Sequence, residues 1–522
     1  MAYIGLLFFI SGISGLVYEV VWTRMLTLTF GNTTYSATTV LASYMGGLAL
    51  GSFLAGKYID KAKNLIKIYG ILELLIAFVA LLIPFALDAL VPLYKTIGAT
   101  LNPSLFIFGL IRFFISFLMF LLPTTLMGAT LPVLSKALIN SKKNLGERLG
   151  FLYSINTLGA VFGCFLSGFF LISLCGIKAS IYLAAFLNLI IGIFAVFLSS
   201  REEGKAARAE RAEKGVPTHF HSKKIALLAA IVFGISGFAS LGYEVVWTRN
   251  LIFVFTSSVY SFTVMLMVFL AGIALGSLVF SRIVDREKDP VLLLSLIQLM
   301  IGLFSFIALY SFKLFYYVFE KFVMTDISAI SLGEFSFAAL YFIVLIFPST
   351  FFMGAAFPVT GKLVAGDIKT LGRSIGNVYS LNTIGAILGA FTTGFLLVPL
   401  IHGQNTLGLL IIINAAVGFF FFCLAGKRKK NTKLIYGMGV FVAALGISLF
   451  FQEDIFTSIV KFKVEKFAGP VKVIFSDEDV EAKVSVFEEA VSKERTLWIN
   501  GLIVAGKCLD TKLMAHLPPF HD

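Results

Sequence analysis

Charged residues are scarce in this chain of 522 residues: together they make up 14% of it, whereas hydrophobic residues make up 58%. Soluble globular proteins carry about 25% charged residues. The apolar residues fall in blocks of roughly 18 or more, enough to cross a hydrocarbon core about 30 Å thick. The scarcity of charge excludes an ordinary soluble protein, and the long blocks predict a polytopic α-helical membrane protein and not a β-barrel.

Cysteine is also scarce, and the few cysteines form no Cys-x-x-Cys pair, which excludes a disulfide framework and a zinc site. They stand far apart, at Cys164, Cys175, Cys423 and Cys508. His219 and His221 lie in a polar stretch without Cys, Asp or Glu at ligand spacing, so no metal site is expected. The chain has no Walker loop and no nucleophile elbow, so no catalytic residue and no resident cofactor are predicted.

Acidic residues are few, 29 against 42 basic ones, which gives a net charge of +13. In a soluble protein this balance would suggest nucleic acid as a partner. Here Lys and Arg gather in short segments between apolar blocks, as in the cytoplasmic loops of membrane proteins, so no nucleic-acid role is predicted. The basic segments lie after the second apolar block, between the fourth and fifth apolar blocks, near 200–215 and at Lys427–Lys430. All fall on one side if the N-terminus is cytoplasmic.

The first ten residues, MAYIGLLFFI, contain no basic segment and no small-residue cleavage site. We therefore interpret them as the start of the first spanning helix and not as a signal peptide. We expect a multi-pass protein of the inner (plasma) membrane, with the lipid bilayer as its main surroundings. A thirteenth apolar stretch would carry the residues after about 452 to the extracytoplasmic side.

A heptapeptide, Tyr-Glu-Val-Val-Trp-Thr-Arg, occurs twice, at Tyr18–Arg24 and 225 positions later at Tyr243–Arg249. A duplicated block in so apolar a chain predicts two units of the same orientation, related by an axis along the membrane normal. The register extends far beyond the heptapeptide, with a slip of one position: Leu50-Gly51-Ser52 matches Leu275-Gly276-Ser277, Asp60 matches Asp285, Met127-Gly128-Ala129 matches Met353-Gly354-Ala355, and Tyr153 to Thr157 match Tyr379 to Thr383.

The expected fold is therefore an all-α polytopic membrane protein: a duplicated six-plus-six helix bundle, a thirteenth helix and a short C-terminal β-meander. The meander is predicted because apolar and polar residues alternate from Val471, and an Asn-Gly turn at Asn500 separates two strand-like runs. The expected parts are a first six-helix repeat at 1–199, a basic cytoplasmic linker at 200–223, a second six-helix repeat at 224–426, the thirteenth helix at 427–452, and a partial β domain at 469–522.

Two sets of residues carry a resemblance to known families. The segment Gly56–Lys61 fits the Gly-x-x-x-Asp-Arg/Lys motif that follows the second helix in the major facilitator superfamily, and the duplicated bundle is similar to that superfamily. The tail resembles the N-terminal β-domain of spermidine synthase, through Glu481–Glu488, Leu497–Gly501 and His516–Pro518. Together they resemble the bacterial fused facilitator/spermidine-synthase membrane proteins, a resemblance that covers essentially the whole chain.

This resemblance implies a bundle that binds or transports a small solute, with a polyamine or another organic cation as the expected substrate class. The chain also departs from the synthases in several respects. The chain ends at Asp522, before the Rossmann-like domain that would hold decarboxylated S-adenosylmethionine, and Ala482, Asp510 and Thr511 replace ligand-binding residues of the synthases. We therefore interpret the chain as a truncated or split member. The alternatives are a membrane-bound aminopropyltransferase whose catalytic domain is missing or separately encoded, and a membrane scaffold for such an enzyme, so enzyme activity stays open.

Candidate substrate-binding residues are the ionisable and amide side chains inside the predicted spans. Glu73 lies about 12 Å into the third helix and has Gln298 as its repeat mate. A carboxylate at that depth costs about 2.5 kcal/mol or more unless it faces a cavity or a partner. It is interpreted either as a cation- or proton-binding group in a central cavity or as a structural hydrogen-bond acceptor for Asn156 or Tyr153. Arg112 lies inside the fourth helix, and Glu73 is its expected partner.

The heptapeptide repeats supply the pairs Glu19 with Glu244 and Arg24 with Arg249. They are interpreted as a gate or a rim for a cationic substrate, or else as interfacial anchors beside an aromatic belt that includes Tyr18. For two further pairs of residues, a structural role is expected instead of solute binding. Asn156 and Asn382 are expected to hold helices together beside glycines spaced four apart. Asp60 and Asp285 are expected to brace the cytoplasmic loops.

Overall fold

The computed structural model describes the chain over 2–30, 33–103, 105–139, 145–209, 223–255, 258–322, 332–365, 371–429, 471–478, 483–499 and 502–505, with single residues between 439 and 470. In this part of the chain, 11 segments are long and apolar enough to cross a membrane. One of them, Leu371–Ala425, is 55 residues long and is broken at His402, whose φ is 66°. Because about 80 Å of helix exceeds a single crossing, we count it as two, which gives twelve crossings.

The first half contains six of these crossings. Its helices are apolar over most of their surface, as expected for segments that face both lipid and protein. They are α1 (Ala2–Phe30), α2 (Thr33–Tyr58), a short 3₁₀ turn η1 (Ile59–Lys61), α3 (Leu65–Leu101), α4 (Leu105–Leu138), α5 (Leu145–Leu166) with a π-helical turn η3 (Ser167–Leu171), α6 (Ile172–Cys175) and α7 (Ile177–Ala209).

The second half repeats this order. Its elements are α8 (Lys223–Phe255), α9 (Ser258–Arg286), α10 (Pro290–Phe322), α11 (Leu332–Val364), α12 (Leu371–Thr392), the π-helical turn η5 (Thr393–Leu397) and α13 (Val398–Lys429). Even the irregularities recur: the break at Gly176 (φ 81°) before α7 corresponds to the break at His402 within α13. The duplication read from the sequence is therefore present in the backbone.

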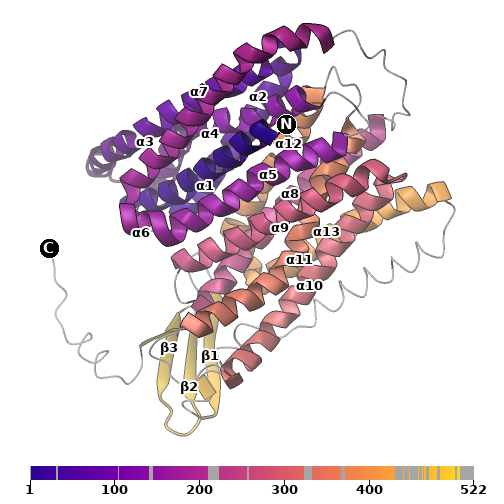
Figure 1. Cartoon of the computed structure of the whole chain (residues 1–522). Helices are drawn as coiled ribbons and strands as arrows, with labels where there is room; N and C mark the ends of the chain where they lie inside the picture. The colour runs from indigo at the N-terminus through magenta and orange to yellow at the C-terminus, as the bar shows by residue number, and fades with distance from the viewer. Residues whose placement is uncertain are drawn as a thin grey trace.

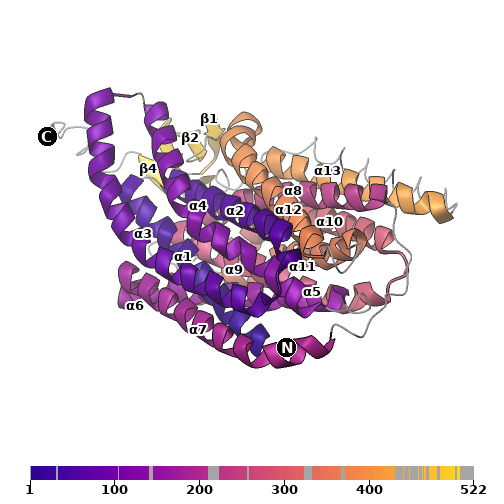
Figure 2. The ribbon, with the colours of Figure 1, turned by 90° about the horizontal axis from the view of Figure 1, so that it is seen from above.

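The two halves lie side by side, as Figure 1 shows by the change from indigo and magenta to orange, and Figure 2 shows the same bundle from above. They meet where α5 packs on α9 and α2 packs on α12. Within each half, α1 packs on α5 and α8 packs on α12. These contacts need glycine: a Cβ on Gly159 would lie 1.9 Å from Phe9 O, and one on Gly385 would lie 1.9 Å from Gly234 O. The expected close packing at the glycines of helices α5 and α12 is thus present.

Several predicted boundaries differ from the observed ones. The third apolar block of the sequence ends near residue 87, but α3 continues to Leu101, and α7 continues to Ala209, into residues expected to form the linker. Residues 210–222 lie outside the described part of the chain. The predicted thirteenth helix at 427–452 also lies outside it, except for the last turn of α13 and two single residues, and it is not the element labelled α13.

The C-terminal meander is an antiparallel sheet in the order β1-β2-β3-β4. Its strands are β1 (Val471–Glu478), β2 (Lys483–Glu489), β3 (Arg495–Ile499) and β4 (Leu502–Ala505). Phe487 and Trp498 pack edge to face at 6.4 Å and share a small core with Val471. The fold class is confirmed, although the Asn-Gly turn and the segment after 505 lie outside the described residues.

The sheet is fixed to the end of the second half that lies away from the N-terminus (Figure 1). Arg249 Nη2, near the end of α8, lies 3.2 Å from Glu478 Oε1 in β1. The other carboxylate oxygen accepts a hydrogen bond of 3.0 Å from the backbone nitrogen of Gly403, directly after the break at His402. The start of α8, at Lys223, lies at the opposite end of the bundle.

Candidate functional site

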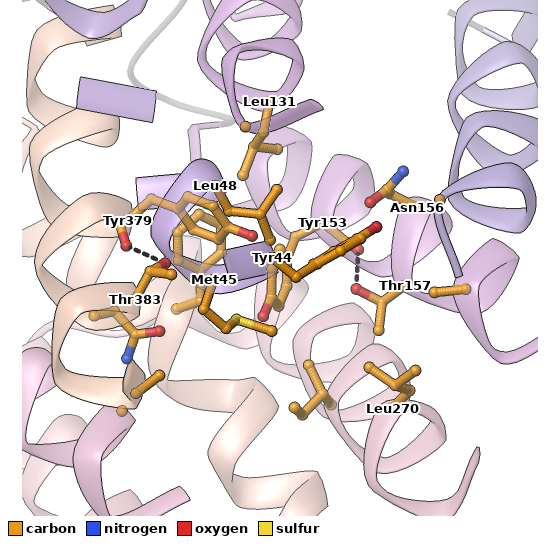
Figure 3. Close-up of a pocket in the computed structure, with 18 of the residues that line it drawn as sticks. Tyr44, Met45, Leu48, Leu131, Tyr153, Asn156, Thr157, Leu270, Tyr379 and Thr383 are labelled. Atoms are coloured by element: carbon orange, nitrogen blue, oxygen red, sulfur yellow. Dashed lines mark hydrogen bonds between the residues drawn. The ribbon is translucent and has the colours of Figure 1, made fainter. Parts of the chain in front are cut away.

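A cavity of about 200 Å³ lies between the two halves. Figure 3 shows part of its lining, with side chains from both halves pointing inward. The described residues that line it come from α1, α2, α4 and α5 of the first half and from α8, α9, α11 and α12 of the second. Helices α3, α7, α10 and α13 contribute none of the described lining, so they form the periphery of the bundle.

The lining consists largely of repeat pairs. Ser11 with Ser236, Glu19 with Glu244, Met127 with Met353, Tyr153 with Tyr379, Asn156 with Asn382, Thr157 with Thr383 and Ala160 with Ala386 all face this cavity. The axis that relates the halves therefore passes through the cavity. Any solute bound here contacts equivalent groups from the two halves.

Glu19 and Glu244 supply the charge of the cavity. Their exposed fractions are 4% and 5%, and each comes from the heptapeptide repeat of its own half. Both carboxyl groups line the same cavity, one from each half. Among the described residues that line the cavity, none is Lys, Arg or His. Both acids therefore line one site between the two halves.

Aromatic side chains form part of the cavity wall. Tyr153 and Tyr379, from opposite halves, have ring centroids 6.3 Å apart, and the Tyr153 ring centroid lies 4.5 Å from that of Phe357. Tyr44 lines the cavity from α2, as Figure 3 shows. Ring faces attract cations, so this wall complements the carboxylates. The match of Tyr153 with Tyr379 across the repeat was visible in the sequence, but it did not show that these tyrosines line a site.

The two arginines of the repeat do not line the cavity. Arg24 is exposed, and Arg249 pairs with Glu478 of the sheet. The described lining of the cavity therefore does not include the two arginines that were expected at its rim. The aromatic-belt interpretation is wrong: Tyr18 and Trp22 are fully buried and stack 5.2 Å apart, and Trp22 stacks in turn on Phe120 of α4.

Glu73 lies outside the cavity, behind α1. It is fully buried between α1, α3 and α7 and accepts hydrogen bonds from Ser11 Oγ at 2.7 Å and from Asn188 Nδ2. Asn188 Oδ1 in turn accepts a bond of 3.0 Å from the Tyr18 hydroxyl. The predicted partner Asn156 is wrong, because that side chain bonds the backbone of α1 instead.

The second half holds an uncharged copy of this network. Gln298, the repeat mate of Glu73, is fully buried and donates to Ser236 Oγ at 3.2 Å. Asn414 donates to the Tyr243 hydroxyl at 3.1 Å. The importance of Asn188 and Asn414 was missed from sequence. The available signal was an asparagine inside an apolar block, matched by another 226 positions later.

Arg112 does not pair with Glu73. Its guanidinium carbon lies 4.0 Å from the centroid of the Phe108 ring and 5.7 Å from that of Tyr94. Tyr94 is 21 positions beyond Glu73 on α3, about 30 Å along the helix. The two charges are thus near opposite ends of α3, which sequence composition alone does not reveal.

The two asparagines of the cavity wall tie helices together. Asn156 Nδ2 donates to Phe8 O at 3.0 Å, and Asn382 Nδ2 donates to Phe233 O at 2.7 Å. Each bond joins the first helix of a half to its fifth crossing, beside the glycine contacts described above. The expected structural role of both amides is therefore present.

Asp60 and Asp285 join the two halves. Asp60 follows α2 and accepts hydrogen bonds of 3.1 Å from the backbone nitrogens of Gly372 and Arg373 at the start of α12. Asp285, at the end of α9, accepts equivalent bonds from Gly146 and Glu147 at the start of α5. Each carboxylate thus caps a helix of the other half, where the partial positive charge of the helix terminus favours an anion.

Lys136 lies 3.3 Å from Asp60 Oδ1 and adds an ion pair to the first of these contacts. The expected brace near basic residues is therefore present, but it crosses between halves instead of staying within a loop. In the described part of the chain, no cluster of three or more His, Cys, Asp or Glu could hold a metal ion.

The chain was compared with known proteins. A family model described as Major Facilitator Superfamily matches residues 4–325. A search of curated proteins found no match. Among solved structures, the human organic anion transporter MFSD10 (TETRAN) and the proton:xylose symporter XylE, bound to 6-bromo-6-deoxy-D-glucose, each align with a TM-score of 0.50 at 11% identity over 80% of this chain, covering 98% and 94% of those chains.

The E. coli fucose:proton symporter FucP aligns with a TM-score of 0.47 at 12% identity, over 80% of this chain and 98% of its own. The two structures that align with a TM-score of 0.50 show a shared fold, and at 11% identity they leave the solute open.

Proposed function

The chain belongs to the Major Facilitator Superfamily, and on that premise we propose that its central cavity binds and transports a small organic cation. Membership makes it a multi-pass membrane transporter of small solutes. The observation that carries the choice of a cation is the pair Glu19 and Glu244, buried in one cavity whose described lining contains no basic side chain.

Electrostatics favours this solute over the alternatives. Two carboxylates in a site screened from water repel an anion, and burying them without a counter-charge is costly. A cation neutralises them, and the rings of Tyr153 and Tyr379 offer further attraction. Two structural neighbours are described as transporters of organic anions and of xylose, but their low identity does not carry those solutes over to this chain.

The symmetry between the two halves narrows the class of solute further. One carboxylate comes from each half, so a linear diamine with an ammonium group at each end would meet equivalent groups at both ends. Such a dication balances the formal charge of two carboxylates. Polyamines, which the tail resemblance also suggests, belong to this class. Because the bound solute bridges the halves, rocking of one half against the other would expose it to either side of the membrane.

Flux measurements in proteoliposomes test the proposal. We expect the protein to move labelled 1,4-diaminobutane and spermidine, and to ignore xylose and an organic anion. Glu19→Gln and Glu244→Gln should each weaken binding by about 2 kcal/mol or more, about 30-fold, because each leaves part of the dication unpaired. Asp88→Asn is the matched control, since Asp88 lies on α3 with its side chain 60% exposed.

The opposite pattern would contradict the proposal. If an anion or a neutral sugar is transported and the diamines are not, the cavity acids serve another purpose. If both glutamine variants move diamines as well as the unmodified protein does, the carboxylates do not bind the solute.

A second candidate is that the bundle anchors an aminopropyltransferase, or is part of one. The observation that favours it is that the described part of the residues resembling the spermidine synthase β-domain, 483–488 and 497–499, lies in an antiparallel meander, with Val484 paired to Ile499. Purified protein would be incubated with 1,4-diaminobutane and decarboxylated S-adenosylmethionine. We expect no spermidine from this chain alone, and its formation would favour the enzyme.

A further inference from the structure

Glu73 is a buried acid that the cavity does not use. Its side chain is fully buried on α3, and its two carboxylate oxygens accept bonds from Ser11 on α1 and Asn188 on α7. The titratable groups that face it are Tyr18 on α1 and Tyr69 on α3, both uncharged as phenols. No basic side chain is among the described groups that act on it.

An acid in such surroundings needs a positive partner. An ionised carboxylate inside a membrane costs about 2.5 kcal/mol or more, and neutral donors only partly offset that cost. The neighbours of Glu73 supply hydrogen bonds but no counter-charge. The remaining way to neutralise it is to bind a cation, and a proton is the cation that fits a fully enclosed site of this kind.

The equivalent position in the second half shows which hydrogen bond an uncharged side chain makes there. Gln298 occupies the equivalent place in the second half and donates through Nε2 to Ser236 Oγ at 3.2 Å. A protonated Glu73 has nearly the shape of glutamine and would donate through Oε1 to Ser11 Oγ in the same way. When Glu73 is ionised, the bond reverses and Ser11 donates. The contact of 2.7 Å between these atoms serves both states.

Ser11 also connects this acid to the solute site. It is the residue of the Glu73 network that lines the cavity, on the same helix as Glu19. We propose that Glu73 is a proton-binding site that exchanges its proton with the cavity through the Ser11 hydroxyl. The site lies behind α1, in the first half alone, because its counterpart Gln298 does not titrate.

The transfer balances in atoms and charge. On loading, a hydronium ion in the cavity gives a proton to Ser11 Oγ, while Ser11 passes its own hydroxyl proton to Glu73 Oε1. One O–H bond breaks on Ser11 as another forms there, a neutral carboxylic acid results, and a water molecule remains in the cavity. Release follows the same steps in reverse.

Ser11 and Glu19 lie eight positions apart on α1, about 12 Å along the helix. A shift of α1 during rocking therefore moves the proton path and one solute carboxylate together. The coupling of proton to solute rests on the proposed function, whereas the existence of the proton site does not.

Infrared difference spectra of the purified protein across a pH titration test the site itself. We expect a carbonyl band of a protonated carboxylic acid that is lost in Glu73→Gln and retained in Asp88→Asn. Ser11→Ala should keep the band but shift it, because the acid loses a hydrogen-bond partner. A band set in Glu73→Gln identical to that of the unmodified protein would overturn the proposal.

Transport of labelled 1,4-diaminobutane tests the coupling. In the unmodified protein and in Asp88→Asn, we expect an imposed pH gradient to change the net flux. Glu73→Gln should lose that response and keep counterflow, the exchange of labelled for unlabelled probe without net charge movement. Should Glu73→Gln fail to fold, Ser11→Ala, which keeps the acid, should slow the response to the gradient. A normal response in both variants would contradict the relay. If the unmodified protein moves no probe, the cation assignment fails, and the infrared result alone decides the proton site.

Discussion

Asp60 Oδ1 lies 3.1 Å from the backbone nitrogen of Gly372, and this contact joins the end of α2 in the first half to the start of α12 in the second. Asp285 makes the equivalent contact with Gly146 in the opposite direction. The two together close the bundle at the end that holds the N-terminus, so they oppose separation of the halves there.

Removing these contacts should loosen that end. We expect Asp60→Ala and Asp285→Ala each to cost about 1–3 kcal/mol of the closed arrangement, the value of a charge-assisted hydrogen bond. Spin labels on α2 and α12 should report a broader and longer distance distribution, most of all in the double variant. Asp88→Asn, on the outer surface, should leave the distribution unchanged, and an unchanged double variant would show that other contacts close this end.

The glycine contacts between α1 and α5 predict a steric effect. Gly159→Ala would place a Cβ 1.9 Å from Phe9 O, and we expect thermal unfolding in detergent to occur earlier by the equivalent of about 1–3 kcal/mol. Gly109→Ala on α4 is the control, since nothing lies within 4 Å of its added Cβ. That variant should be neutral or stabilised, because alanine favours helix. Equal behaviour of the two would mean that α1 shifts without cost.

Loss of the Glu478 carboxylate should release the sheet. Glu478→Gln weakens both its ion pair with Arg249 and its bond from Gly403, for a cost of about 1–3 kcal/mol. Hydrogen exchange of β1 and β2 amides should accelerate. Arg24→Gln is the matched control, because Arg24 is the exposed repeat mate of Arg249. Unchanged exchange in Glu478→Gln would mean that the sheet is held by other contacts.

The tyrosine wall predicts a difference between ring and hydroxyl. If the Tyr153 ring attracts the cation, Tyr153→Phe should bind 1,4-diaminobutane nearly as well as the unmodified protein, whereas Tyr153→Leu should lose about 0.5–1 kcal/mol, or about two- to fivefold. Isothermal titration of the purified variants measures both. The reverse order would show that the hydroxyl, and not the ring, contacts the solute.

The fold was predictable because its strongest signals are local or repeated. Long apolar blocks set the crossings, and the register between the halves set their common orientation. The alternation after Val471 predicted the sheet. The ends of α3 and α7 were not predicted, since an apolar or weakly polar stretch continues a helix without a sequence signal at its end.

The site was only partly predictable, because sequence fixes the depth of a residue better than its direction. Glu19 and Glu73 both sit inside spans, yet only Glu19 faces the cavity. The helices are apolar on nearly every side, so no polar face shows which way a lone acid points. Likewise, Tyr18 looked interfacial by type and lies in the core, where it donates to Asn188.

The carboxylate of Glu478 binds α8 through Arg249 and the start of the last crossing through Gly403, and both belong to the second half. The C-terminal sheet therefore moves together with the second half when one half rocks against the other. A fluorophore on the sheet and another on the first half would then register each transport cycle as a change in energy transfer.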